Sequence, residues 1–120
     1  MAKTILLVED SPAHLKLMES ALEGLGYEII TADDGEKALE QVARRRPDLV
    51  LLDVLLPKKN GYQVCRQLKS AESTHSIPVI MVSSKNQESD RYWGMKQGAD
   101  GYLTKPFQAK ELVAAVTSHL

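Results

Sequence analysis

The stretch LVLLDVLLPKKNG, residues 49–61, joins an apolar run to a turn that contains Pro, Asn and Gly, and Asp53 stands where the run ends. A short run that is apolar almost throughout is typical of a strand covered on both faces, as in a parallel sheet. A carboxylate at its end is costly to remove from water unless another group pairs with it or uses it. The stretch therefore predicts a buried strand whose last residue belongs to a site.

Further short strand-like runs recur along the chain. We expect strands at residues 4–8, 28–32, 49–53, 79–83 and 101–104, each followed by a segment with the periodicity of a helix. This alternation is typical of stacked β-α units, whose right-handed crossovers place helices on both faces of one parallel sheet. The sequence therefore predicts an α/β domain in which ligands bind at the carboxyl ends of the strands.

The first and fourth helices have recognisable ends. Ser11 and Pro12 mark the start of the first helix, since Ser caps helices and Pro suits their first turn, and Gly24 and Gly26 mark its end. Its apolar residues step by three or four and predict one stripe, formed by Leu15, Met18, Leu22 and Leu25. We expect the fourth helix to run from about residue 86 to 97 and to end at Gly98.

The composition limits the classes of function. At 120 residues with 43% hydrophobic side chains, the chain is expected to form one domain with its own core. A net charge of −1, from 15 basic and 16 acidic side chains, gives no general electrostatic reason to bind nucleic acid or an anionic membrane. We also expect no DNA-binding output within this chain, because the fifth predicted helix reaches its end.

The only cysteine, Cys65, cannot form an internal disulfide, and it lies among helical apolar positions, which favours a core thiol over a reactive one. The apolar run at residues 4–8 is too short for a signal peptide or a membrane-spanning helix. These features predict a cytoplasmic protein, and we expect a monomer. The three histidines, His14, His75 and His119, are far apart in sequence and lack a paired acid, so we interpret them as surface residues.

Polar residues gather at the predicted strand ends. Glu9 and Asp10 follow the first strand, Asp53 ends the third, Ser83 ends the fourth, and Lys105 follows the fifth. Three carboxylates brought together would repel one another, which implies a hard cation with oxygen ligands, Mg²⁺ or Mn²⁺. Lys105 and Ser83 are what a phosphoryl group bound to one carboxylate would need, a cation and a hydrogen-bond donor.

These residues, together with the turn LPKKNG and Pro106 after Lys105, resemble the receiver domain of bacterial two-component response regulators. The resemblance covers residues 1–120 and is closest to single-domain, CheY-like members. It implies a flavodoxin-like fold, with a five-stranded parallel sheet in the order 2-1-3-4-5 flanked by five helices. Within the family, residues 84–107 look similar to PilH-like regulators of twitching motility and phototaxis.

The resemblance also implies roles in phosphoryl chemistry. Asp53 would be the phosphoacceptor for the phosphohistidine of a histidine kinase. Lys105 would contact the phosphate, Ser83 would be the switch hydroxyl, and Tyr102 would be the switch aromatic that rotates inward on phosphorylation. The bond before Pro106 would be cis, as in the family's lysine-proline pair.

For the metal, the resemblance implies that Mg²⁺ or Mn²⁺ is bound by Glu9, Asp10, the side chain of Asp53 and the backbone carbonyl of Leu55. For the output, it implies that phosphorylation changes the face made by the fourth helix, fifth strand and fifth helix. A downstream protein partner would read that face. The expected function is a signalling switch in motility or taxis, without catalysis beyond self-phosphotransfer and autodephosphorylation.

Other readings remain open. A phosphatase of the haloacid dehalogenase type also uses Asp, Lys, a hydroxyl and Mg²⁺, but it carries a second aspartate two residues after the nucleophile, where this chain has Leu55. A phosphate sink, or a scaffold in which Asp53 and Lys105 form a plain salt bridge, is a third class. Glu9 and Asp10 could also simply cap the first helix.

Overall fold

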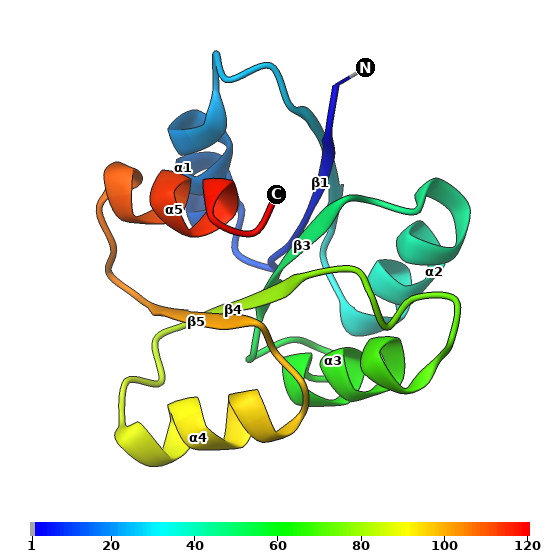
Figure 1. Cartoon of the computed structure of the whole chain (residues 1–120). Helices are drawn as coiled ribbons and strands as arrows, with labels where there is room; N and C mark the ends of the chain where they lie inside the picture. Colours follow the sequence, from blue (N-terminus) through cyan, green and yellow to red (C-terminus); the bar gives the residue numbers. More distant parts are fainter. Residues whose placement is uncertain (1) are drawn as a thin grey trace.

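The five apolar runs form one parallel sheet in the order β2-β1-β3-β4-β5 (Figure 1). The computed structural model describes residues 2–120. Its strands are β1 (Thr4–Val8), β2 (Glu28–Ala32), β3 (Leu49–Asp53), β4 (Val79–Ser83) and β5 (Gly101–Thr104). The predicted strand boundaries and strand order are confirmed. Strand β3 lies at the centre and is buried along its whole length, which explains its nearly unbroken apolar sequence.

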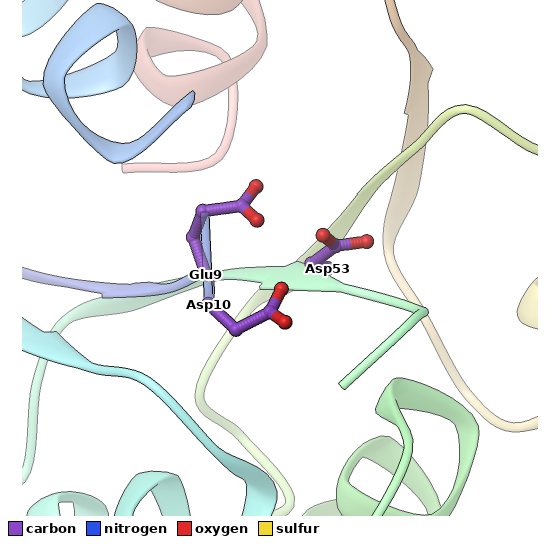
Figure 2. A group of neighbouring side chains, drawn as sticks. All are labelled: Glu9, Asp10 and Asp53. Carbon is purple, nitrogen blue, oxygen red and sulfur yellow. The ribbon is translucent and has the colours of Figure 1, made fainter. Parts of the chain in front are cut away.

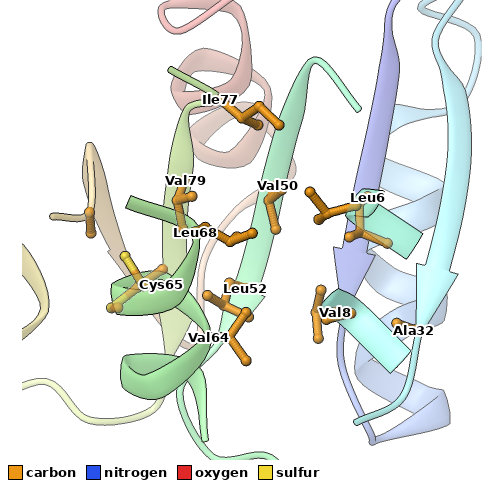
Figure 3. Close-up of a cluster of buried hydrophobic side chains, with 14 of the residues drawn as sticks. Leu6, Val8, Ala32, Val50, Leu52, Val64, Cys65, Leu68, Ile77 and Val79 are labelled. Atoms are coloured by element: carbon orange, nitrogen blue, oxygen red, sulfur yellow. The ribbon is translucent and has the colours of Figure 1, made fainter. Parts of the chain in front are cut away.

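Five helices cover the sheet on both faces (Figure 1). They are α1 (Pro12–Leu22), α2 (Gly35–Arg45), α3 (Gly61–Ser70), α4 (Glu88–Lys96) and α5 (Ala109–Thr117). Helices α1 and α5 pack on one face, and their buried residues share a core with alternate strand residues such as Leu49 and Leu51. Helices α2 and α3 cover the other face, where Figure 3 shows the second core around Val50 and Leu52. Because side chains alternate along a strand, Asp53 continues the row of Leu49 and Leu51, toward α1.

Gly24 and Gly26 end the first helix as predicted, but the assignment of Leu25 to its apolar stripe and the start of the fourth helix differ from the expectation. Helix α1 ends at Leu22, and Leu25 is 45% exposed, so Leu25 does not belong to the apolar stripe. The reason is local, because Gly24 and Gly26 take the positive φ values of 81° and 83° that end a helix. Helix α4 begins at Glu88 rather than near residue 86, since Gln87 forms its N-cap with a capping box.

The cysteine prediction is confirmed. Cys65 is a free thiol buried in the core beneath α3, and burial raises its pKa to about 11. A thiol held in this form is a poor nucleophile. Over residues 2–120, no helix combines the length and apolar character that a bilayer crossing requires.

Candidate functional site

The acidic residues predicted to meet do lie together at the carboxyl edge of the sheet (Figure 2). Glu9 and Asp10 follow β1, Asp53 ends β3, and the two strands pair side by side up to Val8 and Leu52. One carboxylate oxygen from each of the three acids lies within 4.8 Å of the others. Glu9 and Asp53 are buried, whereas Asp10 is exposed. The group is therefore open to solvent on one side only.

The β3-α3 turn holds Asp53 in place. The Asp53 Oδ1 atom accepts a hydrogen bond from the Leu55 amide at 3.1 Å. The Gly61 amide donates to the Val54 carbonyl at 2.8 Å, and a methyl group at Gly61 would clash with the Asp53 carbonyl oxygen. Asn60 caps α3 through a capping box. The Asn-Gly pair in the turn thus brings the start of α3 directly against the end of β3.

Lys105 brings its ammonium group into the acidic cluster. It follows β5, and its Nζ atom donates to Glu9 Oε1 at 2.6 Å and to Asp53 Oδ2 at 3.3 Å. The Lys105 backbone amide donates to the Ser83 carbonyl at 2.8 Å, which ties the residue to the end of β4. The peptide bond before Pro106 is cis, as the family resemblance implies.

The carboxylates influence each other's ionisation. Burial, followed by the neighbouring Glu9, raises the pKa of Asp53 to about 6, although Lys105 and the Leu55 amide act in the opposite direction. Burial also acts to raise the pKa of Glu9, but its hydrogen bonds, with Lys105 first among them, outweigh burial and hold that pKa below the usual value. One ammonium group thus contacts two of the three carboxylates in the cluster, and the carboxylate oxygens fit a Mg²⁺ or Mn²⁺ ion.

Glu9 combines the two roles considered for it. Its Oε1 atom accepts from Lys105, and its Oε2 atom accepts from the Ser11 amide at 3.1 Å, just before α1 begins. Glu9 thus holds the amide of the N-cap residue while belonging to the acidic cluster, and the cap of α1 itself is Ser11. Ser11 in turn caps α1, as predicted, by accepting from the His14 amide at 3.3 Å.

Ser83 and Tyr102 meet at Lys85, in the loop between β4 and α4. The buried Ser83 Oγ accepts from the Lys85 amide at 3.1 Å, and the Tyr102 hydroxyl donates to the Lys85 carbonyl at 2.8 Å. Tyr102 is only 7% exposed, with the Arg91 guanidinium 5.5 Å from the ring centroid. The ring of Tyr102 is thus buried and held by its hydroxyl in this structure, and its role as the switch aromatic stays a prediction.

His14 is a member of the cluster that the sequence pattern missed. Its Nδ1 atom lies 3.0 Å from Lys105 Nζ and 3.9 Å from Glu9 Oε1. The available signal was the Ser11 cap, which places His14 in the first turn of a helix that starts at the site. The surface interpretation holds for His75 and His14, which are both exposed, although His14 also contacts the cluster. His119 is half-buried and lies at the opposite end of β5, where its Nε2 is 3.2 Å from the Asp100 carbonyl.

An apolar groove opens beside the ammonium group of Lys105. It has a volume of about 550 Å³ and lies between α1 and the loop that precedes α5. Its apolar walls are formed mainly by Leu17, Met18, Ala21, Pro106 and Phe107. An exposed apolar groove next to a charged cluster is typical of a site that a macromolecular partner approaches.

Comparison with known proteins identifies relatives along the whole chain. A family model described as the response regulator receiver domain matches residues 5–117. The chain is 42% identical over 120 residues to the alkaline phosphatase synthesis transcriptional regulatory protein PhoP of Bacillus subtilis (strain 168), covering 100% of this chain and 49% of PhoP. It is 39% identical over 116 residues to protein PilH of Pseudomonas aeruginosa, covering 97% of this chain and 96% of PilH. It thus spans about half of PhoP and nearly all of PilH.

Solved structures agree with these matches. A putative response regulator from Chloroflexus aurantiacus superposes with a TM-score of 0.95 at 35% identity, covering 99% of this chain and 98% of that one. The receiver domain of a sensor histidine kinase from Pseudomonas aeruginosa superposes with a TM-score of 0.90 at 32% identity, covering 98% and 97%. That second structure has a magnesium ion coordinated in its active site cleft.

Proposed function

This chain belongs to the family of response regulator receiver domains, and we propose on that premise that Asp53 accepts a phosphoryl group from the phosphohistidine of a sensor kinase. The observation that carries the proposal is the environment of the Asp53 carboxylate. It is buried at the end of the central strand, oriented by the Leu55 amide and Lys105, and placed beside two further acids. Receiver domains are signalling domains, and this chain carries no reaction beyond its own phosphorylation and dephosphorylation.

The transfer is a displacement at phosphorus. An Asp53 carboxylate oxygen forms the new bond to phosphorus, while the bond from phosphorus to the kinase imidazole breaks and the imidazole keeps that electron pair. Lys105 then donates to a phosphoryl oxygen, and Ser83 turns its hydroxyl to donate to another.

We assign the metal site to Glu9, Asp10 and the Asp53 side chain, together with the backbone carbonyl of Leu55. A bound Mg²⁺ or Mn²⁺ ion supplies neutralising charge for the phosphoryl oxygens. The assignment rests on the short distances between the oxygens of the three carboxylates and on the preference of these ions for oxygen ligands. The magnesium ion in the active site cleft of the related Pseudomonas receiver supports it by analogy.

The groove beside Lys105 is the approach we assign to the kinase, because its lining includes Lys105, which contacts the Asp53 carboxylate. The output surface is α4-β5-α5, where Tyr92 and Trp93 are 61% and 52% exposed. The resemblance of residues 84–107 to PilH-like regulators supports an output in motility or taxis. We further propose that residues 1–120 act as one monomeric, cytoplasmic receiver that contacts proteins rather than nucleic acid or membrane.

Labelling with acetyl phosphate tests the proposal. We expect wild-type protein to gain one phosphoryl group in Mg²⁺ or Mn²⁺ and none in chelator, and Asp53→Asn to gain none. Asp33→Asn is a matched control, because Asp33 follows β2 at the same edge of the sheet but is exposed and paired with Lys37. Equal labelling of Asp53→Asn, or equal labelling in chelator, would overturn the assignment.

A further inference from the structure

Three acceptors surround the ammonium group of Lys105, one for each of its N–H donors. They are Glu9 Oε1 at 2.6 Å, His14 Nδ1 at 3.0 Å and Asp53 Oδ2 at 3.3 Å. Each comes from a different element: the end of β1, the first turn of α1 and the end of β3. We propose that His14 is a positioning residue, which holds Lys105 over the acceptor site while the other two partners change roles.

The direction of the His14 bond follows from the chemistry of the donor. A lysine ammonium group has three donors and no acceptor, so His14 Nδ1 accepts with its lone pair and the imidazole proton resides on Nε2. The position of His14 is set by the helix start, because its backbone amide donates to the Ser11 hydroxyl oxygen. The backbone of His14 is therefore held in a position from which the imidazole contacts Lys105.

His14 becomes important when Asp53 is phosphorylated. This step of the argument rests on the proposed function. Asp53 gives up its bond to Lys105 when its carboxylate becomes an acyl phosphate, and Glu9 is shared with the metal. His14 is the one acceptor that neither event engages. Lys105 is only 12% exposed, so a lysine without His14 would have to leave a sheltered position to satisfy its third donor in water. His14 thus keeps the ammonium group directed at the incoming phosphoryl oxygens.

Nitrogen NMR of the Lys105 ammonium group tests the contact without any phosphorylation. In wild type we expect a resolved ammonium signal whose protons exchange slowly with water, and a His14 signal with the proton on Nε2. His14→Leu removes the acceptor and should speed that exchange by about tenfold, the factor for losing one hydrogen bond to a charged group. His14→Asn restores an acceptor at the δ1 position and should return the exchange rate to within about twofold of wild type.

The same variants then measure the consequence for phosphoryl uptake. We expect His14→Leu to take up label from acetyl phosphate about five- to tenfold more slowly, and His14→Asn to recover most of the rate. His75→Leu, at an exposed histidine, is the matched control and should leave both readouts unchanged. Because His14 is half-exposed on α1, its replacement should not unfold the chain, which amide spectra would verify.

The outcomes separate the two claims. If wild type labels normally and His14→Leu matches it in both exchange and uptake, the positioning role is wrong. The role is also wrong if His14→Asn fails to recover either readout. If wild type takes no label on Asp53, the proposed function fails, while the NMR comparison still decides whether His14 holds Lys105.

Discussion

The Asp53 carboxylate is buried beside Glu9, and burial raises its pKa to about 6. Its unfolded value is about 3.9, so between these two values the folded chain holds a proton that the unfolded chain has lost. The contribution of Asp53 to stability is therefore full below about pH 4 and is lost as the pH rises through 6. At neutral pH the metal-free site costs the fold free energy, which is the electrostatic reason for a cation to bind there.

We expect Asp53→Asn to raise the free energy of unfolding by about 1–2 kcal/mol at pH 7.5 in chelator, and by much less at pH 4. Added Mg²⁺ should stabilise wild type but not the variant, because only wild type keeps all three carboxylates. Urea denaturation at both pH values measures the difference. Asp33→Asn, at an exposed and paired carboxylate, should give no such gain, and a gain of equal size there would contradict the site-specific explanation.

We expect Leu55 to govern the lifetime of an acyl phosphate on Asp53. It lies two residues after Asp53 and is 53% exposed, so it stands at the solvent side of the site without a polar group to orient water. We expect Leu55→Asn to lose its phosphoryl group several-fold faster than wild type, because an amide can hold the attacking water. Decay of the label after removal of acetyl phosphate measures this, and equal decay rates would refute it.

The junction between β3 and α3 is the element on which the geometry of the site depends. A Cβ atom at Gly61 would clash with backbone atoms of Asp53 and Val54, which cannot move without displacing the strand end. We expect Gly61→Ala to lower the free energy of unfolding by about 2–3 kcal/mol through overpacking. Gly101→Ala is the matched control, since a methyl group there meets only ordinary contacts of 3.5 Å or more. Urea titration of both variants measures the effect, and similar stabilities would show that the close approach at Gly61 is not required.

The pattern of apolar residues explains which helices and strands could be predicted from the sequence. Continuous apolar runs such as Leu49–Asp53 leave little choice but buried strands, and their boundaries were predicted correctly. The start of α1 followed from its capping residue Ser11. The end of α1 followed from Gly24, but Leu25 was wrongly assigned to the apolar stripe, because it continues the apolar periodicity beyond the turn in which Gly24 ends the helix. Periodicity records which residues are apolar, but not where the backbone turns away from the core.

Across the whole molecule, the loop between β4 and α4 is held by two hydrogen bonds at Lys85, one to Ser83 and one from Tyr102. Helix α4 packs closely on this region, since a methyl group at Gly94 would lie 2.8 Å from Met81 and 3.0 Å from the Tyr102 ring. A change in the Ser83 hydrogen bond can therefore reach the exposed face of α4 without any rotation of Tyr102.

We expect beryllofluoride with Mg²⁺, a mimic of the phosphoryl group, to draw the Ser83 hydroxyl toward Asp53 and away from the Lys85 amide. The loop and α4 should then shift, changing the fluorescence of Trp93, the only tryptophan. Ser83→Ala should blunt this change while the mimic still binds, whereas Ser84→Ala, at the exposed neighbour, should not. If only the amide resonances around Asp53 move, the proposed coupling from Ser83 to the α4 face is wrong.

The orientations of individual side chains could not be predicted from the pattern of apolar and polar residues. Strand ends located Glu9, Asp53 and Lys105 because the carboxyl edge of a parallel sheet gathers them regardless of rotamer. The inward ring of Tyr102 and the reach of His14 depend on individual torsions and on neighbouring elements. Neither leaves a periodic signal in the chain.

The bonds of Lys105 join distant parts of the chain, since Glu9 lies 96 residues before it and Asp53 lies 52 residues before it. During synthesis, both carboxylates leave the ribosome long before the lysine that pairs with them. A nascent chain that stops short of β5 therefore lacks the ammonium group that contacts these two carboxylates. Of the residues that contact the Asp53 carboxylate, Lys105 is the last to be synthesised, so the cluster is completed only after β5 has been made.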